Sequence, residues 1–178
     1  MTPINRNMEP CFTKLTVKST IRQDLLKFCE DGNQWIDPTV GTFFQKNPPR
    51  DLIFSDPFLQ HICDNCLSNN GYNTDVKIYR ITPWTHYMLH TDEYRSSSIN
   101  LLINDESDSI SYFKASDTYN KLHIKILELK YEQDSYYLFN SKIPHAITNR
   151  DSTRYLLSIT LKDNFYSMSK YLKTQLVL

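Results

Sequence analysis

The spacing of apolar residues changes near residue 74 and separates a part with helical spacing from a part with strand spacing. Before that point, apolar residues recur at helical intervals in two segments. The first segment follows Ser19 and Thr20, which are residue types favoured at helix N-caps. The second starts at Asp56-Pro57, an N-cap residue followed by proline at the first helical position. We therefore predict that residues 1–73 form a helical support.

After residue 74, apolar and polar residues alternate in short runs, as they do in half-buried strands, and turn-forming residues separate the runs. The predicted strands cover residues 76–81, 85–92, 98–103, 110–113, 122–126, 136–139, 146–148 and 154–161. Many short strands with regular turns are typical of a β-sandwich or barrel. We predict a mainly β fold with flanking helices, namely a double-stranded β-helix of the jelly-roll or cupin-like kind.

The length of 178 residues fits one domain with a substantial core, because two independent domains would be cramped. We therefore predict a single domain over residues 1–178. It consists of the helical support over 1–73, the jelly-roll core over 74–162 and a C-terminal segment, 163–178, expected to form a helix on one sheet.

The charges balance, with 20 Lys and Arg residues against 20 Asp and Glu residues. Zero net charge gives no electrostatic footprint for nucleic acid or for an anionic membrane. The first residues lack an apolar core of signal-peptide length, and no stretch reaches the roughly 18–20 apolar residues of a membrane span. We expect a cytoplasmic protein without membrane or nucleic-acid partners. Cys63 and Cys66 form a lone CxxC, which is weak evidence for zinc and is expected to lie on a helix.

Three residues from two distant segments have the types needed for a metal site. His90 and Asp92 stand two positions apart on a predicted strand, so their side chains can point to the same face. His145, which follows Pro144 near a later strand, can complete a three-point face. Two histidines and one carboxylate on one face of an octahedron leave the other positions open, which is the ligand set of non-haem Fe(II) oxygenases.

A planar cation follows the distal histidine. Arg154 opens an apolar strand shortly after His145. A guanidinium matches a carboxylate bidentately, and such a charge-assisted hydrogen bond contributes about 1.5–3 kcal/mol. Arg154 is therefore a candidate to hold the far carboxylate of a dicarboxylate bound at the metal.

Together, the stretches YRITPWTHYMLHTDEYRSSSINLLIN and YYLFNSKIPHAITNRDSTRYLLSIT resemble the Fe(II)/2-oxoglutarate-dependent dioxygenases. The resemblance covers roughly residues 75–161. Its block from Pro144 to Arg154 is most similar to aspartyl/asparaginyl β-hydroxylase and prolyl hydroxylase relatives. Two features depart from the family pattern: Tyr155-Leu156 follows the arginine where many relatives have x-Ser, and Glu132-Gln133-Asp134-Ser135 stands where a turn glycine is usual.

The resemblance implies an oxidoreductase that binds Fe(II) on His90, Asp92 and His145 and the cosubstrate 2-oxoglutarate on Arg154. It implies hydroxylation of an unactivated C–H bond with O2, release of succinate and CO2, and a stimulating effect of ascorbate. The expected substrate is an amino acid, free or in a peptide, or a small metabolite.

Further residues near these motifs are candidates for the same pocket. Tyr79, Tyr87 and Asn100 can offer neutral hydrogen bonds to the cosubstrate, and Ser158 lies on the same strand face as Arg154. Arg95 and Trp84 stand near the metal strand and are candidates for the substrate entrance, where Arg95 could meet a substrate carboxylate.

Two alternatives stay open at this point. The first is a cupin-type metal dioxygenase that uses no 2-oxoglutarate and therefore has no need for the Arg154 clamp. The second is a non-catalytic jelly-roll binding module. The intact set of His90, Asp92 and His145 argues against the second alternative, because loss of function usually removes a ligand.

Overall fold

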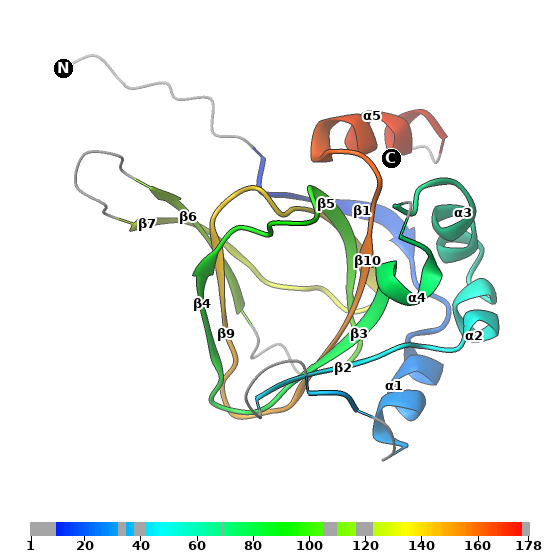
Figure 1. The fold of residues 1–178 in the computed structure, drawn as a ribbon, viewed down its shortest axis with the longest axis horizontal. Helices are drawn as coiled ribbons and strands as arrows, with labels where there is room; N and C mark the ends of the chain where they lie inside the picture. Colours follow the sequence, from blue (N-terminus) through cyan, green and yellow to red (C-terminus); the bar gives the residue numbers. More distant parts are fainter. Residues whose placement is uncertain are drawn as a thin grey trace.

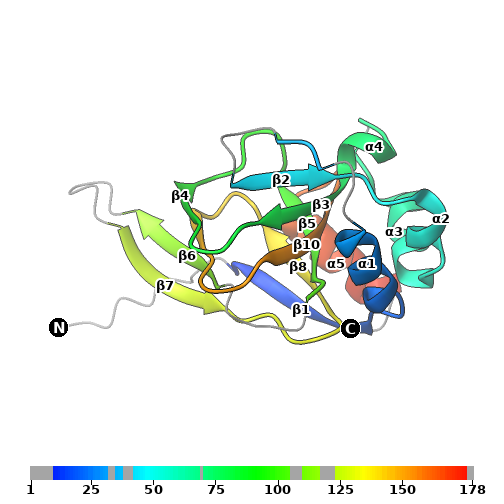
Figure 2. The same ribbon diagram turned by 90° about the horizontal axis from the view of Figure 1, so that it is seen from below.

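The computed structural model describes residues 10–31, 35–37, 42–68, 70–104, 110–116 and 123–175, with the backbone alone for residues 110–116 and 123–126. The chain folds into two antiparallel sheets that face each other, with helices outside (Figures 1 and 2). The strands are β1 (Phe12–Lys18), β2 (Phe43–Lys46), β3 (Val76–Ile81), β4 (His86–His90), β5 (Ser97–Leu102), β6 (Ile110–Ser116), β7 (His123–Leu129), β8 (Ser135–Asn140), β9 (His145–Thr148) and β10 (Arg154–Thr160). The helices are α1 (Arg22–Glu30), α2 (Arg50–Phe54), α3 (Pro57–Asn65), α4 (Tyr72–Asp75) and α5 (Phe165–Gln175).

The larger sheet has the strand order β1-β8-β5-β10-β3-β2, and the smaller has the order β4-β9-β6-β7. Neighbours in both sheets run antiparallel, and sequence neighbours are distributed between the sheets, so the chain crosses repeatedly from one to the other. This arrangement is the predicted jelly roll, and the fold class is confirmed. Every predicted strand is present, with ends that differ by a few residues at most.

Alternation along the strands sorts side chains into two clusters. On β10, Leu157 and Ile159 point to the helix side and pack with apolar residues of α1, α2, α3 and α5. Leu156 points to the space between the sheets and packs in a second cluster with Leu102, Tyr131 and other residues. Because strand side chains alternate with period two, Arg154 and Ser158 share the interior face with Leu156.

The helical support predicted over residues 1–73 does not consist of helices alone. Two strands lie in this range, and they form the two edges of the larger sheet: β1 pairs with β8, and β2 pairs with β3. Four residues suffice for β2, which is too short for a periodic signal. The N-cap of α1 is also not Ser19 or Thr20 but Ile21, without a side-chain cap. The domain division itself stays a prediction.

The C-terminal and cysteine predictions can be compared directly with the structure. Helix α5 places Phe165, Met168 and Leu172 in the helix-side core, as expected for a helix that covers a sheet. Cys63 lies on α3 and Cys66 is its C-cap residue, and both are free thiols. Burial raises the pKa of the Cys63 thiol to about 12. Within the described residues, no helix is long and apolar enough to cross a membrane.

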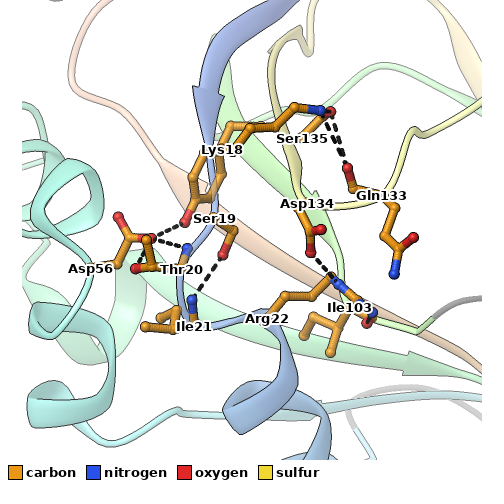
Figure 3. A network of polar contacts seen from close by, with 11 residues as sticks. Lys18, Ser19, Thr20, Ile21, Arg22, Asp56, Ile103, Gln133, Asp134 and Ser135 are labelled. Carbon is orange, nitrogen blue, oxygen red and sulfur yellow. Dashed lines mark hydrogen bonds and ion pairs between the residues drawn. The ribbon is translucent and has the colours of Figure 1, made fainter.

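Asp56 ties the helical layer to both β1 and β8. As the predicted N-cap of α3, its carboxylate accepts hydrogen bonds from the backbone N–H groups of Phe58 and Leu59 at 3.0 and 3.1 Å. The same buried carboxylate accepts from the backbone N–H of Thr20 at 3.0 Å (Figure 3). It also accepts from the hydroxyl of Tyr136 at 2.8 Å. One side chain therefore fixes a helix start, the segment after β1 and a core strand.

The turn before β8 functions without the expected glycine. Asp134 has a φ of +58°, in the left-handed region that glycine and Asp or Asn tolerate best. Its carboxylate forms an ion pair with the Nε of Arg22 (Figure 3). The Nη1 of the same guanidinium donates to the carbonyl of Ile103 at 2.8 Å. The ion pair holds the strained residue in place, so the missing glycine does not disturb the strand that follows.

We predict that Asp56→Ala destabilises the protein by about 2–4 kcal/mol. The change removes an N-cap, which costs about 1 kcal/mol, and leaves the buried Tyr136 hydroxyl without its acceptor, which costs about 1–3 kcal/mol more. Urea unfolding followed by circular dichroism measures the effect. Asp64→Ala, at an exposed position on the same helix, is the control and should change stability by less than about 0.5 kcal/mol. Equal loss in both variants would contradict the role of Asp56.

Candidate metal centre

His90, Asp92 and His145 converge between the two sheets. His90 ends β4 and His145 begins β9, and the two residues are direct register partners in this antiparallel pair. Their ring centroids lie 4.3 Å apart. Asp92 follows in the loop just beyond β4, so the HxD motif spans a strand end rather than lying wholly on a strand. One ligand atom from each residue lies within 4.8 Å of the other two.

The backbone fixes both imidazoles with the same orientation. The Nδ1 of His90 bonds to the carbonyl of Met88 at 2.8 Å, and the Nδ1 of His145 bonds to the carbonyl of Ile143 at 2.9 Å. Because a carbonyl only accepts, each Nδ1 carries a hydrogen, which leaves Nε2 as the nitrogen that can bind a metal once it carries no hydrogen. This is the tautomer that a metal-binding histidine needs. The partners that orient the two histidines are main-chain groups, which the residue pattern alone does not reveal.

The carboxylate of Asp92 is divided between two roles. Its Oδ2 accepts a hydrogen bond from the Nε of Arg95 at 2.6 Å, while its Oδ1 lies 3.6 Å from the Nε2 of His90. Ligands bound side by side at about 2.1 Å from a metal lie about 3 Å apart, so a small closing movement would bring these atoms to coordination distance. Arg95 thus leaves one oxygen of Asp92 for a metal. The donor set fits a divalent cation such as Fe(II).

Burial and ion pairing shift the pKa values of all three groups. Burial lowers the pKa of His145 to about 4, so this imidazole is neutral at pH 7. Burial disfavours the charge on Asp92, but hydrogen bonds with His90 and Arg95 and the charge of Arg95 outweigh it and hold the pKa of Asp92 well below its usual range. Burial also lowers the pKa of His90, but Asp92 outweighs that effect and the net shift is upward. Asp92 is therefore ionised, as a metal ligand must be.

A cavity of about 330 Å³ opens onto the three candidate ligands. Aromatic rings form one wall: Phe43 of β2 lies 5.0 Å from Tyr79 of β3 and 5.4 Å from Tyr87 of β4, measured between ring centroids. The ring of Tyr87 meets His90 edge to face at 4.6 Å. The wall therefore joins the edge strands of the two sheets and leads to the metal ligands.

Four of the other predicted site residues lie at this cavity. Tyr79, Tyr87, Arg95 and Ser158 line it. Arg95 differs from its expected role, since its Nη1 donates to the hydroxyl of Ser158 at 2.9 Å and its Nε to Asp92. Arg95 therefore links the metal loop of the small sheet to β10 of the large sheet.

The remaining three predicted residues lie elsewhere. Asn100 is buried on the interior face of β5 and accepts a hydrogen bond from the hydroxyl of Ser98 at 3.1 Å. Arg154 is fully buried, with its guanidinium 5.2 Å from the centroid of the Tyr131 ring. Burial lowers the pKa of Arg154, and Tyr131 opposes that effect. Trp84 lies in the turn between β3 and β4 with 77% of its surface exposed, and it does not line the cavity.

Three residues at the interior were not found from sequence. Phe43 reaches the cavity through β2, Asp75 through the end of α4, and Tyr131 contacts Arg154 from the segment between β7 and β8. Their positions depend on strand pairings over long sequence separations, so no local pattern marks them.

Comparisons with known proteins agree with the fold. No family model matches the chain, and no curated protein matches it. Among solved structures, a prolyl-4-hydroxylase from Pseudomonas putida aligns with a TM-score of 0.57 and 11% identity, over 86% of this chain and 93% of that chain. AviO1 from Streptomyces viridochromogenes Tue57 aligns with a TM-score of 0.45 and 13% identity over 78% and 79% of the two chains. Vicilin from hazelnut, Corylus avellana, aligns with a TM-score of 0.41 and 10% identity, over 74% of this chain and 32% of the vicilin chain. Of these alignments, the one with the prolyl-4-hydroxylase supports the fold, and at 11% identity it supports the fold alone.

We predict that His145→Ala weakens divalent metal binding by more than about 100-fold, because loss of a ligand should exceed the 10–100-fold cost of losing an outer-shell partner. Calorimetric titration with Mn(II) or Co(II) measures this. His86→Ala is the matched control, since His86 lies on β4 with an exposed side chain and bonds to Thr148 instead. If His86→Ala lost affinity to the same extent, the assignment of the ligands would be wrong.

Arg95→Ala should weaken metal binding by about 10–100-fold, because Asp92 loses the partner that orients its carboxylate. The same titration compares Arg95→Ala with Arg150→Ala, which removes an exposed arginine from the turn before β10. Unchanged affinity in Arg95→Ala would mean that the backbone alone positions Asp92.

Proposed function

We propose that this protein is an Fe(II)- and 2-oxoglutarate-dependent oxygenase that hydroxylates an unactivated C–H bond of an amino acid, free or in a peptide, or of a small metabolite. The observation that carries the proposal is the convergence of two histidines, each bonded through Nδ1 to a main-chain carbonyl, and one ionised carboxylate at a cavity inside a jelly roll. Two imidazoles and a carboxylate on one face are the ligand set of non-haem Fe(II) oxygenases.

The metal would be held by His90, Asp92 and His145, with its other positions open to the cavity. Bound iron supplies the oxidation in which 2-oxoglutarate, O2 and R–H become succinate, CO2 and R–OH. The protein contributes ligand geometry and a partly enclosed site that limits side reactions. The aromatic wall of Phe43, Tyr79 and Tyr87 borders the cavity on one side of the candidate ligands.

Arg154 supports the dependence on 2-oxoglutarate. Arg154 places a fully buried guanidinium on the interior face of β10, where the low dielectric strengthens its attraction for an anion. The distal carboxylate of 2-oxoglutarate would meet it with two parallel hydrogen bonds. Tyr131, beside the guanidinium, can add a neutral hydrogen bond to the same carboxylate. A cupin-type dioxygenase without 2-oxoglutarate has no use for this cation.

The decisive experiment is succinate formation from 2-oxoglutarate under air, with Fe(II) and ascorbate. Uncoupled turnover often occurs without the true substrate, so the assay does not depend on knowing it. We expect metal-dependent succinate in the wild type and its loss in His145→Ala. We also expect Arg154→Ala to weaken 2-oxoglutarate binding by about 10–100-fold, the loss of one charge-assisted interaction.

The controls separate binding from folding. Circular dichroism and thermal unfolding check that Arg154→Ala is folded, and Arg150→Ala serves as the neighbouring exposed arginine. Failure of 2-oxoglutarate to bind the metal-loaded wild type, together with absence of succinate, would refute the proposal. The remaining interpretation would then be a metal-binding jelly roll without oxygenase activity.

A further inference from the structure

The charged groups at the cavity divide into those with a partner and those without one. Arg95 pairs with Asp92 and bonds to Ser158, so the lining arginine is already engaged. The other charged residues that line the cavity are Asp75 and Glu93, and among the described residues neither forms an ion pair. With metal and 2-oxoglutarate bound, Asp92 faces the metal and the cosubstrate faces the metal and Arg154. The uncompensated charge of the cavity is therefore negative.

Of the two carboxylates, Asp75 is the stronger candidate for binding a cation. Its surface is only 1% exposed, and the hydroxyl of Ser68 is its side-chain partner, at 2.7 and 2.8 Å from the two oxygens. One hydroxyl supplies one hydrogen to a group with room for about four. The nearby ammonium of Lys77 bonds to Asn47 at 2.8 Å. Among the described residues, this buried carboxylate has one neutral side-chain donor and no cation, although a cation usually accompanies such a charge.

The groups follow an order along β10. Arg154 begins the strand and Thr160 ends it, and about 20 Å separate them at a rise of ~3.3 Å per residue. Ser158, which contacts Arg95, lies between them on the same face. Asp75 directly precedes Val76, the partner of Ile159, and both Asp75 and Thr160 line the cavity. Arg154 and the carboxylate of Asp75 therefore lie at opposite ends of β10.

Aromatic rings accompany the carboxylates. Tyr79 and Tyr87 line the cavity wall, and Tyr94 lies at the rim with 90% of its surface exposed. Aromatic faces attract ammonium and guanidinium groups, the more so where water is excluded. Carboxylates and aromatic rings in one cavity are a chemical match for a cation carried on an aliphatic chain.

We propose that this cavity binds a substrate with an ammonium or guanidinium group on an aliphatic chain, with the cation at Asp75 and the chain beside the metal. The site residues for the cation are Asp75 and, at the rim, Glu93. The role as substrate rests on the proposed oxygenase function, while binding of the cation does not. A free basic amino acid and a basic side chain in a peptide offer the same chemistry.

The test is calorimetric binding to the Mn(II)-loaded protein, under nitrogen, with and without 2-oxoglutarate. L-lysine is compared with its neutral analogue norleucine, and L-arginine with citrulline. A second arm uses an acetylated, amidated Gly-Lys-Gly peptide and its norleucine counterpart. We expect the cationic member of at least one pair to bind about 10–100-fold more tightly, as for a charge-assisted interaction. A preference in the first arm indicates a free amino acid as the ligand, and a preference in the second arm indicates a side chain in a peptide.

Variants locate the effect. Asp75→Asn can still accept from Ser68 but lacks the charge, so it should abolish the preference for the cation. Glu93→Gln, at an exposed position, should reduce the preference by no more than about 5-fold, and it remains informative if Asp75→Asn does not fold. Asp64→Asn, exposed on α3, is the control and should leave the preference intact.

The outcomes separate the two proposals. Equal affinity for lysine and norleucine and for arginine and citrulline in both arms, or absence of binding, would overturn the inference even if succinate is formed. A preference for cations that depends on Asp75, together with absence of 2-oxoglutarate binding and of succinate, would overturn the oxygenase function and leave the cation site standing.

Discussion

The pairing register between β4 and β9 is the constraint on which the candidate site depends. It places His90 directly opposite His145, although the two residues are far apart in sequence. A slip of one residue would turn one imidazole to the other face of the small sheet and remove it from the site. The bulge between Tyr87 and His90 adjusts the pairing just before the ligand, and Asp92 then follows where the strand ends. Bulges of this kind often re-aim a side chain beside functional sites.

The two sheets contribute differently to the interior. The small sheet supplies the two histidines, and the large sheet supplies Arg154 and Ser158 on β10. Arg95 connects the two, because it contacts Asp92 on one side and Ser158 on the other. The geometry of the candidate metal ligands is therefore coupled to the spacing of the sheets. The helices stabilise this spacing from outside through the core that includes Leu157 and Ile159.

Alternation and turn signals, which are short-range, predicted the jelly roll, whereas residue types and the family resemblance selected His90, Asp92 and His145, which the β4–β9 pairing brings together. The same signals placed Tyr79, Tyr87, Arg95 and Ser158 near the metal, and the structure has all four at the cavity. Local patterns failed where position depends on long-range pairing. Phe43 enters the cavity only because β2 pairs with β3, and Trp84 leaves it because its turn has a positive φ and projects outward.

The carbonyl bonds of the two histidines have a consequence for how the site tolerates change. Each imidazole is oriented by the main chain two residues earlier, at Met88 and at Ile143. Every amino acid carries a carbonyl, so substitution of either residue leaves the acceptor in place. Genetic drift can therefore alter the side chains around these histidines extensively while their tautomers stay fixed. By contrast, Asp92 depends on the side chain of Arg95, so this ligand is the vulnerable point of the site under mutation.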